Sequence, residues 1–306
     1  MTDWRHDIAK VTIIIRTRNE SRYLPILLDS LARDRIADST EVVLVDSGST
    51  DATLDIAQSR GARIVKINRD EFSFGRSLNI GCESATGEIL VFISGHCIPT
   101  SEEWLSLLIE PLLNGAAQYS YGRQIGGPET RFSEHRIFRK YFPPSLEEEQ
   151  GGCFCNNANA ALLSSCWKHN RFNEELTGLE DMELAKRILA DGGSVRYIPE
   201  AVVFHHHKER WRGIRHRYER EAMGLRHILP GIHVNLFDSM RYFIAGVIGD
   251  AGEALVQQRL SHHAWEIVAF RFAQYYGIWR GGQSHEKWSR ALRERYFYPN
   301  MNNGKL

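Results

Sequence analysis

Residues 11–20 read VTIIIRTRNE, and residues 41–51 read EVVLVDSGSTD. Each stretch begins with a run of β-branched and other apolar residues, which is typical of a strand buried on both faces of a parallel sheet. Each run stops at polar residues. Between the two runs, the leucines at positions 24, 27, 28 and 31 recur at helical spacing. This order of strand, helix and strand predicts a parallel α/β unit with a right-handed crossover.

The same alternation continues to residue 94. It predicts further strands at 62–67 and 88–94, and helices at 49–57 and 75–84. In an open α/β sheet, ligands bind beyond the carboxyl ends of the strands. We therefore expect the segments that follow three of these strands to line one crevice: 16–20, 46–51 and 94–97.

After residue 99 the pattern is less regular. It predicts helices near 101–113 and 178–190, and strands near 117–125, 194–198 and 202–205, with a loop-rich stretch that includes residues 143–149. From residue 209 onward the sequence is helical, amphipathic and rich in Arg, His and aromatic residues. We therefore predict an α/β domain over residues 1–207 and a helical C-terminal region over residues 208–306.

The composition is that of a globular protein. Of 306 residues, 42% are hydrophobic and 25% charged, which excludes disordered, collagen-like and disulfide-scaffold chains. The 38 basic and 38 acidic residues balance, which argues against a nucleic-acid-binding chain. The balance is uneven along the chain, because residues 205–306 hold 16 Lys and Arg, 9 Asp and Glu, and nine of the thirteen His. An anionic partner met by the C-terminal third is the expectation.

Targeting features point to the cytoplasm. The five Cys are an odd number without a CxxC pair, which favours a reduced compartment. The opening residues, MTDWRHDIAK, contain no apolar core of a signal peptide. No apolar run reaches the roughly 20 residues that a membrane span needs.

The loops after the strands exclude some nucleotide-binding classes. A dinucleotide-binding site needs G-x-G-x-x-G after the first strand, and residues 16–20 contain no Gly. A P-loop ending in GK[ST] is also absent, as is the Gly-rich phosphate loop of a sugar-nucleotide pyrophosphorylase.

Four segments, in order, carry a resemblance to a known family: RTRNE at 16–20, VDSGSTD at 45–51, FGRSLNIG with TGE at 74–88, and FNEE, GLED and ELAKR within 172–187. Over roughly residues 10–207 the chain resembles glycosyltransferase family 2, the inverting enzymes of GT-A fold. It is most similar to the rhamnosyltransferase-like branch that builds cell-surface polysaccharides, and residues 271–281 resemble the C-terminal helices of that branch. The resemblance implies a mostly parallel nucleotide-binding sheet flanked by helices.

The resemblance also implies where a nucleotide-sugar donor binds. Asp46 would accept a hydrogen bond from the base or ribose, although Asp46 and Asp51 also fit a strand end and a helix cap. Asn79 would organise the start of its helix and touch the donor indirectly. The full set of donor-binding positions is Thr17, Arg18, Asn19, Glu20, Asp46, Ser49, Arg76, Asn79, Ser94, Gly95 and His96.

Glu180 and Asp181 match the family's catalytic acidic pair. An acceptor hydroxyl must lose its proton as it attacks, and a positioned carboxylate can accept that proton. We predict Asp181 as the base and Glu180 as the residue that orients the acceptor or metal. The alternative is that both acids only stabilise the helix N-terminus. Asn157, Trp211 and Arg212 are predicted to contact the acceptor or a phosphate.

One departure from the family concerns the metal. Most relatives end the fourth strand with Asp-x-Asp, which holds Mg²⁺ or Mn²⁺, whereas this chain has Ser94-Gly95-His96. His205 and His207 follow a later strand, where this fold often returns a histidine to the metal. Three imidazoles, of His96, His205 and His207, would favour Mn²⁺ over Mg²⁺.

Two alternatives to that site remain open. If no metal binds, Arg212, Arg215 or a protonated His would neutralise the leaving phosphate. A zinc site made by Cys153 and Cys155, one face of a predicted strand, with residues 205–207 is a further reading, although the spacing does not fit a zinc finger. A second departure is Ser47, where many relatives carry another Asp.

The aromatic and basic C-terminal helices are open to two interpretations. They pack on one another, or they also form an interfacial surface for an anionic membrane that carries a lipid-linked acceptor. The sequence as a whole predicts a cytoplasmic, peripheral inner-membrane hexosyl- or deoxyhexosyltransferase of surface glycan assembly, with no nucleic-acid partner. The alternatives are a nucleotidyl or phosphoglycosyl transferase, and a non-catalytic binding or scaffolding protein.

Overall fold

The computed structural model describes residues 10–145, 152–232 and 234–283. Residues 147–149 of the predicted loop, the opening residues 1–9 and the last 23 residues of the predicted C-terminal region lie outside that description. The chain divides into two compact units. The first contains residues 1–127, 142–174 and 180–206, and the second contains residues 128–141, 175–179 and 207–306.

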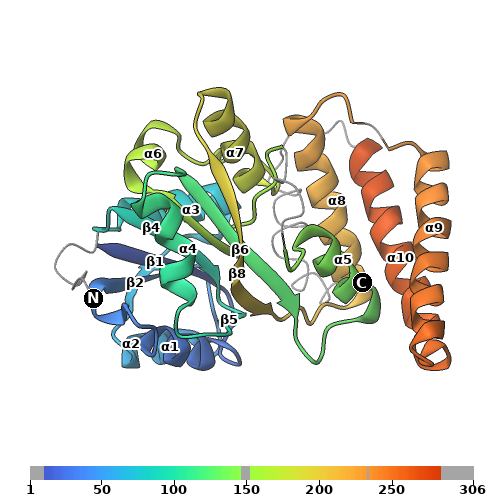
Figure 1. The fold of residues 1–306 in the computed structure, drawn as a ribbon, viewed down its shortest axis with the longest axis horizontal. Helices are drawn as coiled ribbons and strands as arrows, with labels where there is room; N and C mark the ends of the chain where they lie inside the picture. The colour runs from blue at the N-terminus through green and yellow to red at the C-terminus, as the bar shows by residue number, and fades with distance from the viewer. Residues whose placement is uncertain (1–9, 146–151, 233, 284–306) are drawn as a thin grey trace. The chain divides into compact units, whose positions relative to one another are not determined.

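An eight-stranded sheet forms the first unit, in the order β3-β2-β1-β4-β7-β6-β8-β5 (Figure 1). Strands β1 to β4 pair in parallel, as do β6 and β8, whereas β7 and β5 run antiparallel to their neighbours. The strands are β1 Val11–Thr17, β2 Thr40–Asp46, β3 Arg63–Lys66, β4 Ile89–Ser94, β5 Cys97–Pro99, β6 Tyr119–Gly126, β7 Asn159–Leu163 and β8 Val195–His205.

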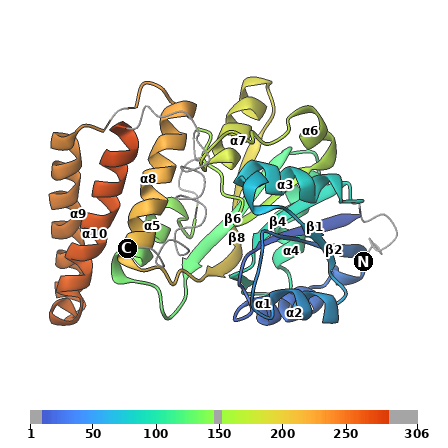
Figure 2. The same ribbon diagram turned by 180° about the vertical axis from the view of Figure 1, so that it is seen from behind.

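Helices cover both faces of this sheet, as Figures 1 and 2 show from opposite sides. Apolar side chains of α1 and α4 pack with Ile13 and Ile15 of β1 in the main core. Ile14 points the other way, toward α3, where Gly81 lets the helix approach Ile14 and Val45 closely. The helices of this unit are α1 Leu24–Ala32, α2 Thr53–Ser59, α3 Phe74–Glu83, α4 Trp104–Leu113, α6 Ser164–His169 and α7 Glu180–Ala190, with short 3₁₀ turns at Ala37–Ser39 and Arg69–Glu71.

The predicted alternation over residues 11–94 is confirmed, with each predicted strand and helix present within a few residues of its expected bounds. The prediction of two strands at 194–198 and 202–205 is wrong, because β8 is one continuous strand. Its pairing with β6 shifts register around Pro199, between Gly122 and Gln124. The Asn159 amide donates to the carbonyls of Arg123 and Ala201, which holds the two strands together at this irregularity.

The two edges of the sheet are short. One edge is β3, which has four residues and carries the exposed cations Arg63 and Lys66 at its ends. The other edge is β5, which has three residues and ends in Pro99. Both edges therefore present few backbone groups that a further strand could pair with.

The predicted strand through Cys153 and Cys155 is also wrong, because residues 152–156 have no regular structure. Cys155 is buried, and burial raises the pKa of its thiol well above the ordinary value. Neither residue joins a group of candidate metal-ligating side chains in the described part of the chain. The zinc reading therefore has no support from the geometry.

The second unit is helical. Figures 1 and 2 show α10 lying between α8 and α9, and α10 packs on both. Gly277 and Gly281 of α10 meet the backbone carbonyls of Arg215 and Glu219 in α8 so closely that a β-carbon would not fit. The helices are α5 Phe132–Tyr141, α8 Trp211–Ile228, α9 Leu236–Val256 and α10 Leu260–Gln283.

Buried ion pairs link these helices. The Asp250 carboxylate of α9 accepts two hydrogen bonds from Arg271 of α10, at 2.7 and 2.8 Å, and one from Arg136 of α5 at 2.7 Å. Arg217 of α8 lies between Glu134 and Glu209, at 2.5 and 2.8 Å. Arg217 is therefore a half-buried cation in a structural ion-pair network, whereas the sequence predicted a basic surface on these helices.

Candidate functional site

The loops after β1 and β2 hold each other in place. Asp46 is buried, and its carboxylate accepts hydrogen bonds from the backbone N–H groups of Gly48 at 2.9 Å and Ser49 at 3.0 Å and from the Ser49 hydroxyl at 2.5 Å. Asn19, whose φ of 57° is left-handed, donates its N–H to the Ser49 hydroxyl and accepts from the Thr50 N–H at 2.7 Å. The predicted donor positions Asn19, Asp46 and Ser49 thus form one preorganised turn.

Asp51 and Glu20 add hydrogen bonds from these two loops to the start of helix α2. Asp51 accepts hydrogen bonds from the Thr53 N–H and hydroxyl at the start of α2, as a helix-start side chain should. The Glu20 N–H donates to the Thr53 hydroxyl at 2.8 Å. The Glu20 backbone is thereby fixed after β1, and its side chain lies against Gly95.

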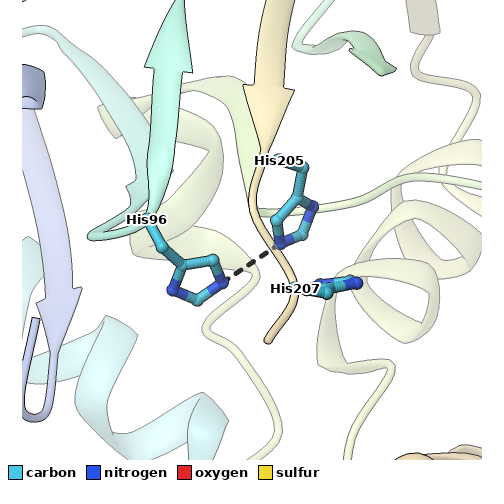
Figure 3. Close-up of side chains that lie close together, drawn as sticks. All are labelled: His96, His205 and His207. Carbon is cyan, nitrogen blue, oxygen red and sulfur yellow. Dashed lines mark hydrogen bonds between the residues drawn. The ribbon is translucent and has the colours of Figure 1, made fainter. Parts of the chain in front are cut away.

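A chain of four side chains crosses this edge. The His96 Nδ1 lies 2.7 Å from Oε1 of Glu20, and its Nε2 lies 3.1 Å from Nε2 of His205. The His205 Nδ1 lies 2.6 Å from Oε1 of Gln124. Figure 3 shows the His96 and His205 imidazoles turned toward one another from the ends of β4 and β8. The Gln124 amide nitrogen donates to Asn156, which fixes the orientation of the Gln124 amide.

The protons on these imidazoles follow from their partners. A carboxylate only accepts, so His96 donates from Nδ1, and the amide oxygen of Gln124 likewise receives the Nδ1 proton of His205. In the neutral rings both Nε2 atoms then carry lone pairs, and these face one another at 3.1 Å. Such a pair needs a proton or a metal cation between the two nitrogens.

The residues fit a metal. Metal-bound histidines usually donate their other ring N–H to a carboxylate or carbonyl oxygen, as His96 and His205 do. With metal–nitrogen bonds of about 2.1 Å, two ligands at a right angle lie about 3 Å apart, close to the Nε2 separation of 3.1 Å. Both histidines belong to a group of candidate metal-ligating side chains. His207, also drawn in Figure 3, belongs to the second unit, where its Nδ1 lies 2.8 Å from Glu134.

The acidic pair lies at the start of α7, and both side chains are buried. Burial, and after it the negative charge of Glu180, raise the pKa of Asp181 to about 7, against hydrogen bonds from the backbone N–H groups of Asn157 and Met182 that lower it. Glu180 instead faces Arg16, with 3.3 Å between the guanidinium and the carboxylate. Leu179, directly before the pair, has a left-handed φ of 62°, a conformation that bulky residues rarely adopt.

Asn157 links strand β6 to the start of helix α7. Its backbone N–H donates to Asp181 at 2.9 Å, and its side-chain oxygen accepts from the Tyr119 hydroxyl at 2.5 Å. Its amide nitrogen Nδ2 is buried and has no hydrogen-bond partner among the described residues. A buried, unsatisfied donor is uncommon in native proteins and is a candidate for contact with a ligand.

Other predicted positions serve the scaffold. The Asn79 side chain makes four hydrogen bonds, to Trp167, Glu174 and both backbone groups of Phe172, which leaves no capacity for a ligand. Asn159, which is not among the predicted site positions, also serves the scaffold, because it bonds Trp104 and two backbone carbonyls. Arg76 is partly exposed and ion-paired with Glu174 at 3.3 Å.

The remaining predicted positions divide between the units. Thr17, Ser94 and Gly95 lie at the carboxyl ends of β1 and β4, and Arg18 follows β1 directly. Trp211 and Arg212 belong to the second unit. There the Arg131 guanidinium stacks 3.8 Å from the Trp211 ring, and Arg212 donates to His216.

Sequence reasoning missed Gln124 and Tyr119, which orient His205 and Asn157 respectively. Both residues lie on β6, at positions that alternation alone assigns to an ordinary strand. Gln124 is buried, but β6 also contains Ser120 and Arg123, so nothing in the sequence distinguishes it from other polar strand residues.

Comparison with known proteins identifies the family of the chain. The family described as "Glycosyl transferase family 2" matches residues 12–167, which is half of the chain. The chain belongs to glycosyl transferase family 2. Among curated family members, it is 25% identical to the O-antigen chain rhamnosyltransferase RfbN of Salmonella typhimurium over 214 residues, 65% of this chain and 67% of that protein. It is 45% identical over 87 residues to a PGL/p-HBAD biosynthesis glycosyltransferase of Mycobacterium tuberculosis, 27% of this chain and one third, 33%, of that protein.

Solved structures share the fold. The mannosyltransferase PcManGT from Pyrobaculum calidifontis, in complex with GDP-Man and Mn²⁺, superposes with a TM-score of 0.64 at 15% identity, covering 92% of this chain and 89% of that chain. Glucosyl-3-phosphoglycerate synthase from M. tuberculosis, in complex with Mn²⁺, UDP-Glc and phosphoglyceric acid, gives a TM-score of 0.52 at 20% identity over 74% and 83% of the two chains. The predicted GT-A fold with a helical C-terminal region is thereby confirmed.

Proposed function

We propose that this glycosyltransferase moves one hexosyl or deoxyhexosyl unit, with inversion, from a nucleotide-sugar donor to a hydroxyl of a glycan or lipid-linked acceptor in cell-surface polysaccharide assembly. The observation that carries the proposal is the pair formed by Asp181 and Asn157. A carboxylate with a pKa of about 7 accepts the backbone N–H of Asn157, whose buried amide nitrogen has no hydrogen-bond partner among the described residues. Perturbed acids beside unsatisfied polar groups are typical of catalytic sites.

The chemistry follows from these residues. The acceptor hydroxyl attacks the anomeric carbon of the donor sugar, the bond from that carbon to the diphosphate oxygen breaks, and the nucleoside diphosphate leaves. Asp181 accepts the hydroxyl proton in the same step, a contribution of about 10²–10⁴-fold. Its pKa near neutrality lets it be ionised before the attack and protonated after it. Glu180, paired with Arg16, orients the acceptor side of the site.

We assign donor binding to the turn formed by Thr17, Arg18, Asn19, Asp46 and Ser49, with Arg76 and Ser94 at its margin. The turn is fixed by its own hydrogen bonds, so it is organised before a ligand arrives. The complexes of PcManGT with GDP-Man and of glucosyl-3-phosphoglycerate synthase with UDP-Glc support a nucleotide-sugar donor. Trp211 and Arg212 stay predictions as acceptor or phosphate contacts.

We further propose that His96 and His205 hold a divalent cation, with His207 a predicted third ligand. The imidazole nitrogens favour Mn²⁺ over Mg²⁺, in line with the Mn²⁺ in the two structures above. A bound cation would stabilise the negative charge that develops on the leaving diphosphate. Glu20 and Gln124 hold the two rings with their Nε2 atoms available for the cation.

We propose that the protein works at the cytoplasmic face of the membrane, where a lipid-linked acceptor would be available. Among the helices that the structure describes, none has the length and apolar character needed to cross a bilayer. A lipid-linked acceptor would therefore have to be reached from the membrane surface. We propose peripheral attachment.

Asp181→Asn tests the transferase proposal. The substitution keeps the shape of the side chain and removes its basicity, so transfer should fall by at least about 100-fold. The affinity of the variant for the donor nucleotide should stay within a few-fold of that of the wild type. Thermal shifts with UDP, GDP, dTDP and CMP measure this affinity, since ligand binding raises the melting temperature by mass action. Asp191→Asn, in the turn after α7, is the matched control. Transfer by Asp181→Asn at the wild-type rate would exclude Asp181, and nucleotide binding without any transfer or donor hydrolysis by the wild type would favour a binding protein.

A further inference from the structure

Helix α9 has an inverted distribution of polarity. A surface helix ordinarily turns its charged residues to solvent and its apolar residues to the core. In α9 two of the three carboxylates face inward instead: Asp250 pairs with Arg136 and Arg271, and Glu253 pairs with Arg136 at 2.9 Å. The outward positions of the helix are therefore left to other residues.

Those outward positions are apolar over the whole length of the helix. Phe237 is 76% exposed, Ile248 66% and Leu255 64%. They recur at intervals of seven to eleven residues, so they lie on the same side of the helix. Leu236, Met240 and Ile244, more than half exposed, extend this side, and Val256 ends the helix.

The neighbouring helix α10 continues the same surface. Trp265 is 76% exposed and Phe272 58%, at helical spacing with the exposed Val268. The Phe272 ring meets the Phe243 ring of α9 edge-on, 6.4 Å between centroids, so the two helices share one face. We call this surface, formed by residues 236, 237, 240, 244, 248, 255, 256, 265, 268 and 272, the apolar face.

The size of the apolar face is unusual for an uncovered surface. Nine of its side chains expose more than half of their area, which amounts to roughly 900 Å² if each contributes about 100 Å². The largest apolar patch of a typical monomer is about 300–600 Å², and larger ones mark protein or membrane contacts.

Charge indicates which of these contacts it is. On α9, α10 and the turn between them, the exposed charged residues within the described part are Arg241 and Arg259, both cations. The acidic residues of these helices are buried or half-buried. Two copies facing each other here would bring cations together without an acidic partner, whereas an anionic lipid surface complements them.

We propose that the apolar face is the surface by which this protein binds an anionic lipid bilayer. The aromatic and aliphatic side chains would enter the boundary between headgroups and acyl chains, as interfacial helices do, while Arg241 and Arg259 contact lipid phosphates. Delivery of a lipid-linked acceptor by this contact rests on the proposed function; the binding itself does not.

Vesicle flotation of the full chain tests the proposal, with vesicles of phosphatidylglycerol and phosphatidylethanolamine and with neutral phosphatidylcholine. The double variant Ile244→Gln, Ile248→Gln should reduce partitioning to anionic vesicles about tenfold or more, because two aliphatic side chains no longer enter the bilayer. The matched control is Ile26→Gln with Leu113→Gln, two residues of equal exposure, 50% each, on α1 and α4. It should float like wild type. Raising the salt to 0.5 M should weaken binding to the anionic vesicles by screening.

Three results would overturn the proposal: no flotation of the wild type, equal flotation of both double variants, or a wild-type dimer that the apolar-face variant dissociates and that binds no vesicle. The last result, read by light scattering without lipid, would assign the face to a second copy of the chain. Donor hydrolysis in solution separates this proposal from the proposed function, since the apolar-face variant should retain it and Asp181→Asn should lose it while floating normally.

Discussion

Asp181 holds its proton more tightly than an aspartate in water does, because its carboxyl is buried beside Glu180. Burial disfavours the charged form, and the neighbouring negative charge adds to that effect. The folded state therefore binds a proton that the unfolded state releases between about pH 4 and pH 7. The contribution of this group to stability is present at low pH and is lost as the pH rises through 7.

The rate of transfer should follow the ionisation of the same group. A base acts only when it is ionised, so the initial rate should fall about tenfold per pH unit as the pH drops below about 7. Rates measured from pH 5.5 to 8.5 with saturating donor give this profile. Glu180→Gln removes the negative charge next to Asp181. The pH at which the rate has fallen to half of its maximum should therefore be lower in this variant than in the wild type. A flat profile in the wild type would contradict the assignment.

A second residue-scale prediction concerns His96. Removing one of two facing imidazoles should lower the affinity for Mn²⁺ by tenfold or more, which electron paramagnetic resonance of free Mn²⁺ measures directly. His96→Ala should also lose the activation by Mn²⁺ that we expect of the wild type. His169→Ala, an exposed histidine on α6, serves as the control. Equal Mn²⁺ binding by wild type and His96→Ala, or undiminished transfer in EDTA, would refute the metal site.

Single residues differ in how far the sequence identifies them. Asp181 was predicted because it lies in a segment that matches the family's acidic pair, and His96 was predicted because it stands where most relatives end their Asp-x-Asp. The contacts of Gln124 with His205 and of Asn157 with Asp181 were not predicted from the sequence. Gln124 orients His205 across 81 residues of chain, and the Asn157 backbone reaches Asp181 across 24. Such contacts depend on which strands become neighbours, and residue spacing does not encode that.

At the scale of elements, α9 depends on a buried carboxylate. Asp250 accepts from both Arg136 and Arg271, and its side chain is only 1% exposed. Asp250→Ala should lower the free energy of unfolding by about 3–5 kcal/mol, because it leaves two guanidinium groups without their partner. Urea denaturation followed by circular dichroism measures the change. Asp238→Ala, near the N-terminus of the same helix and half-buried, is the control and should cost less than about 1 kcal/mol. A loss below 1 kcal/mol for Asp250→Ala would show that the ion pairs do not hold the helix.

The elements themselves were predicted best where the periodicity was strong. Residues 11–94 alternate between two clear periods, and their strands and helices are confirmed. Strand β8 was predicted as two strands, at 194–198 and 202–205, and the gap between them contains Pro199, which cannot donate to a ladder. The register shift opposite Gly122 and Gln124 accommodates that proline. Helix α5 was missed because its residues, FSEHRIFRKY, are largely polar, and it is held by ion pairs to α8 and α9.

Over the whole molecule, the excess of basic residues in the last third describes the surface poorly. Arg271 is buried and Arg217 half-buried in ion pairs, and Arg280 pairs with Glu219 at 3.2 Å. A count of charged residues in the sequence treats these cations as available to a partner, whereas in the structure they form ion pairs within the helical unit. The prediction of a membrane-facing surface consequently moves from the arginines of α8 to the apolar residues of α9 and α10.

The division into units also differs from a single cut near residue 207. Residues 128–141 and 175–179 belong to the helical unit although the sheet unit surrounds them in the sequence. The composition of residues 128–141 and 175–179 did not indicate that these two segments belong to the helical unit. The prediction of two domains, at 1–207 and 208–306, thus stays a first approximation to an interleaved arrangement.

The short edges of the sheet bear on how the protein behaves when it is concentrated. An exposed strand edge can recruit another chain and start fibrous aggregation. Here one edge ends after three residues at Pro99, and the other is bounded by the exposed cations Arg63 and Lys66, which repel an identical neighbour. The six strands between these edges contain the most β-prone, uncharged segments of the chain, among them residues 11–15 and 89–93, and each of these is paired on both sides. The folded sheet therefore offers little template for polymerisation, and any tendency to form amyloid should be confined to chains that have not yet completed the sheet.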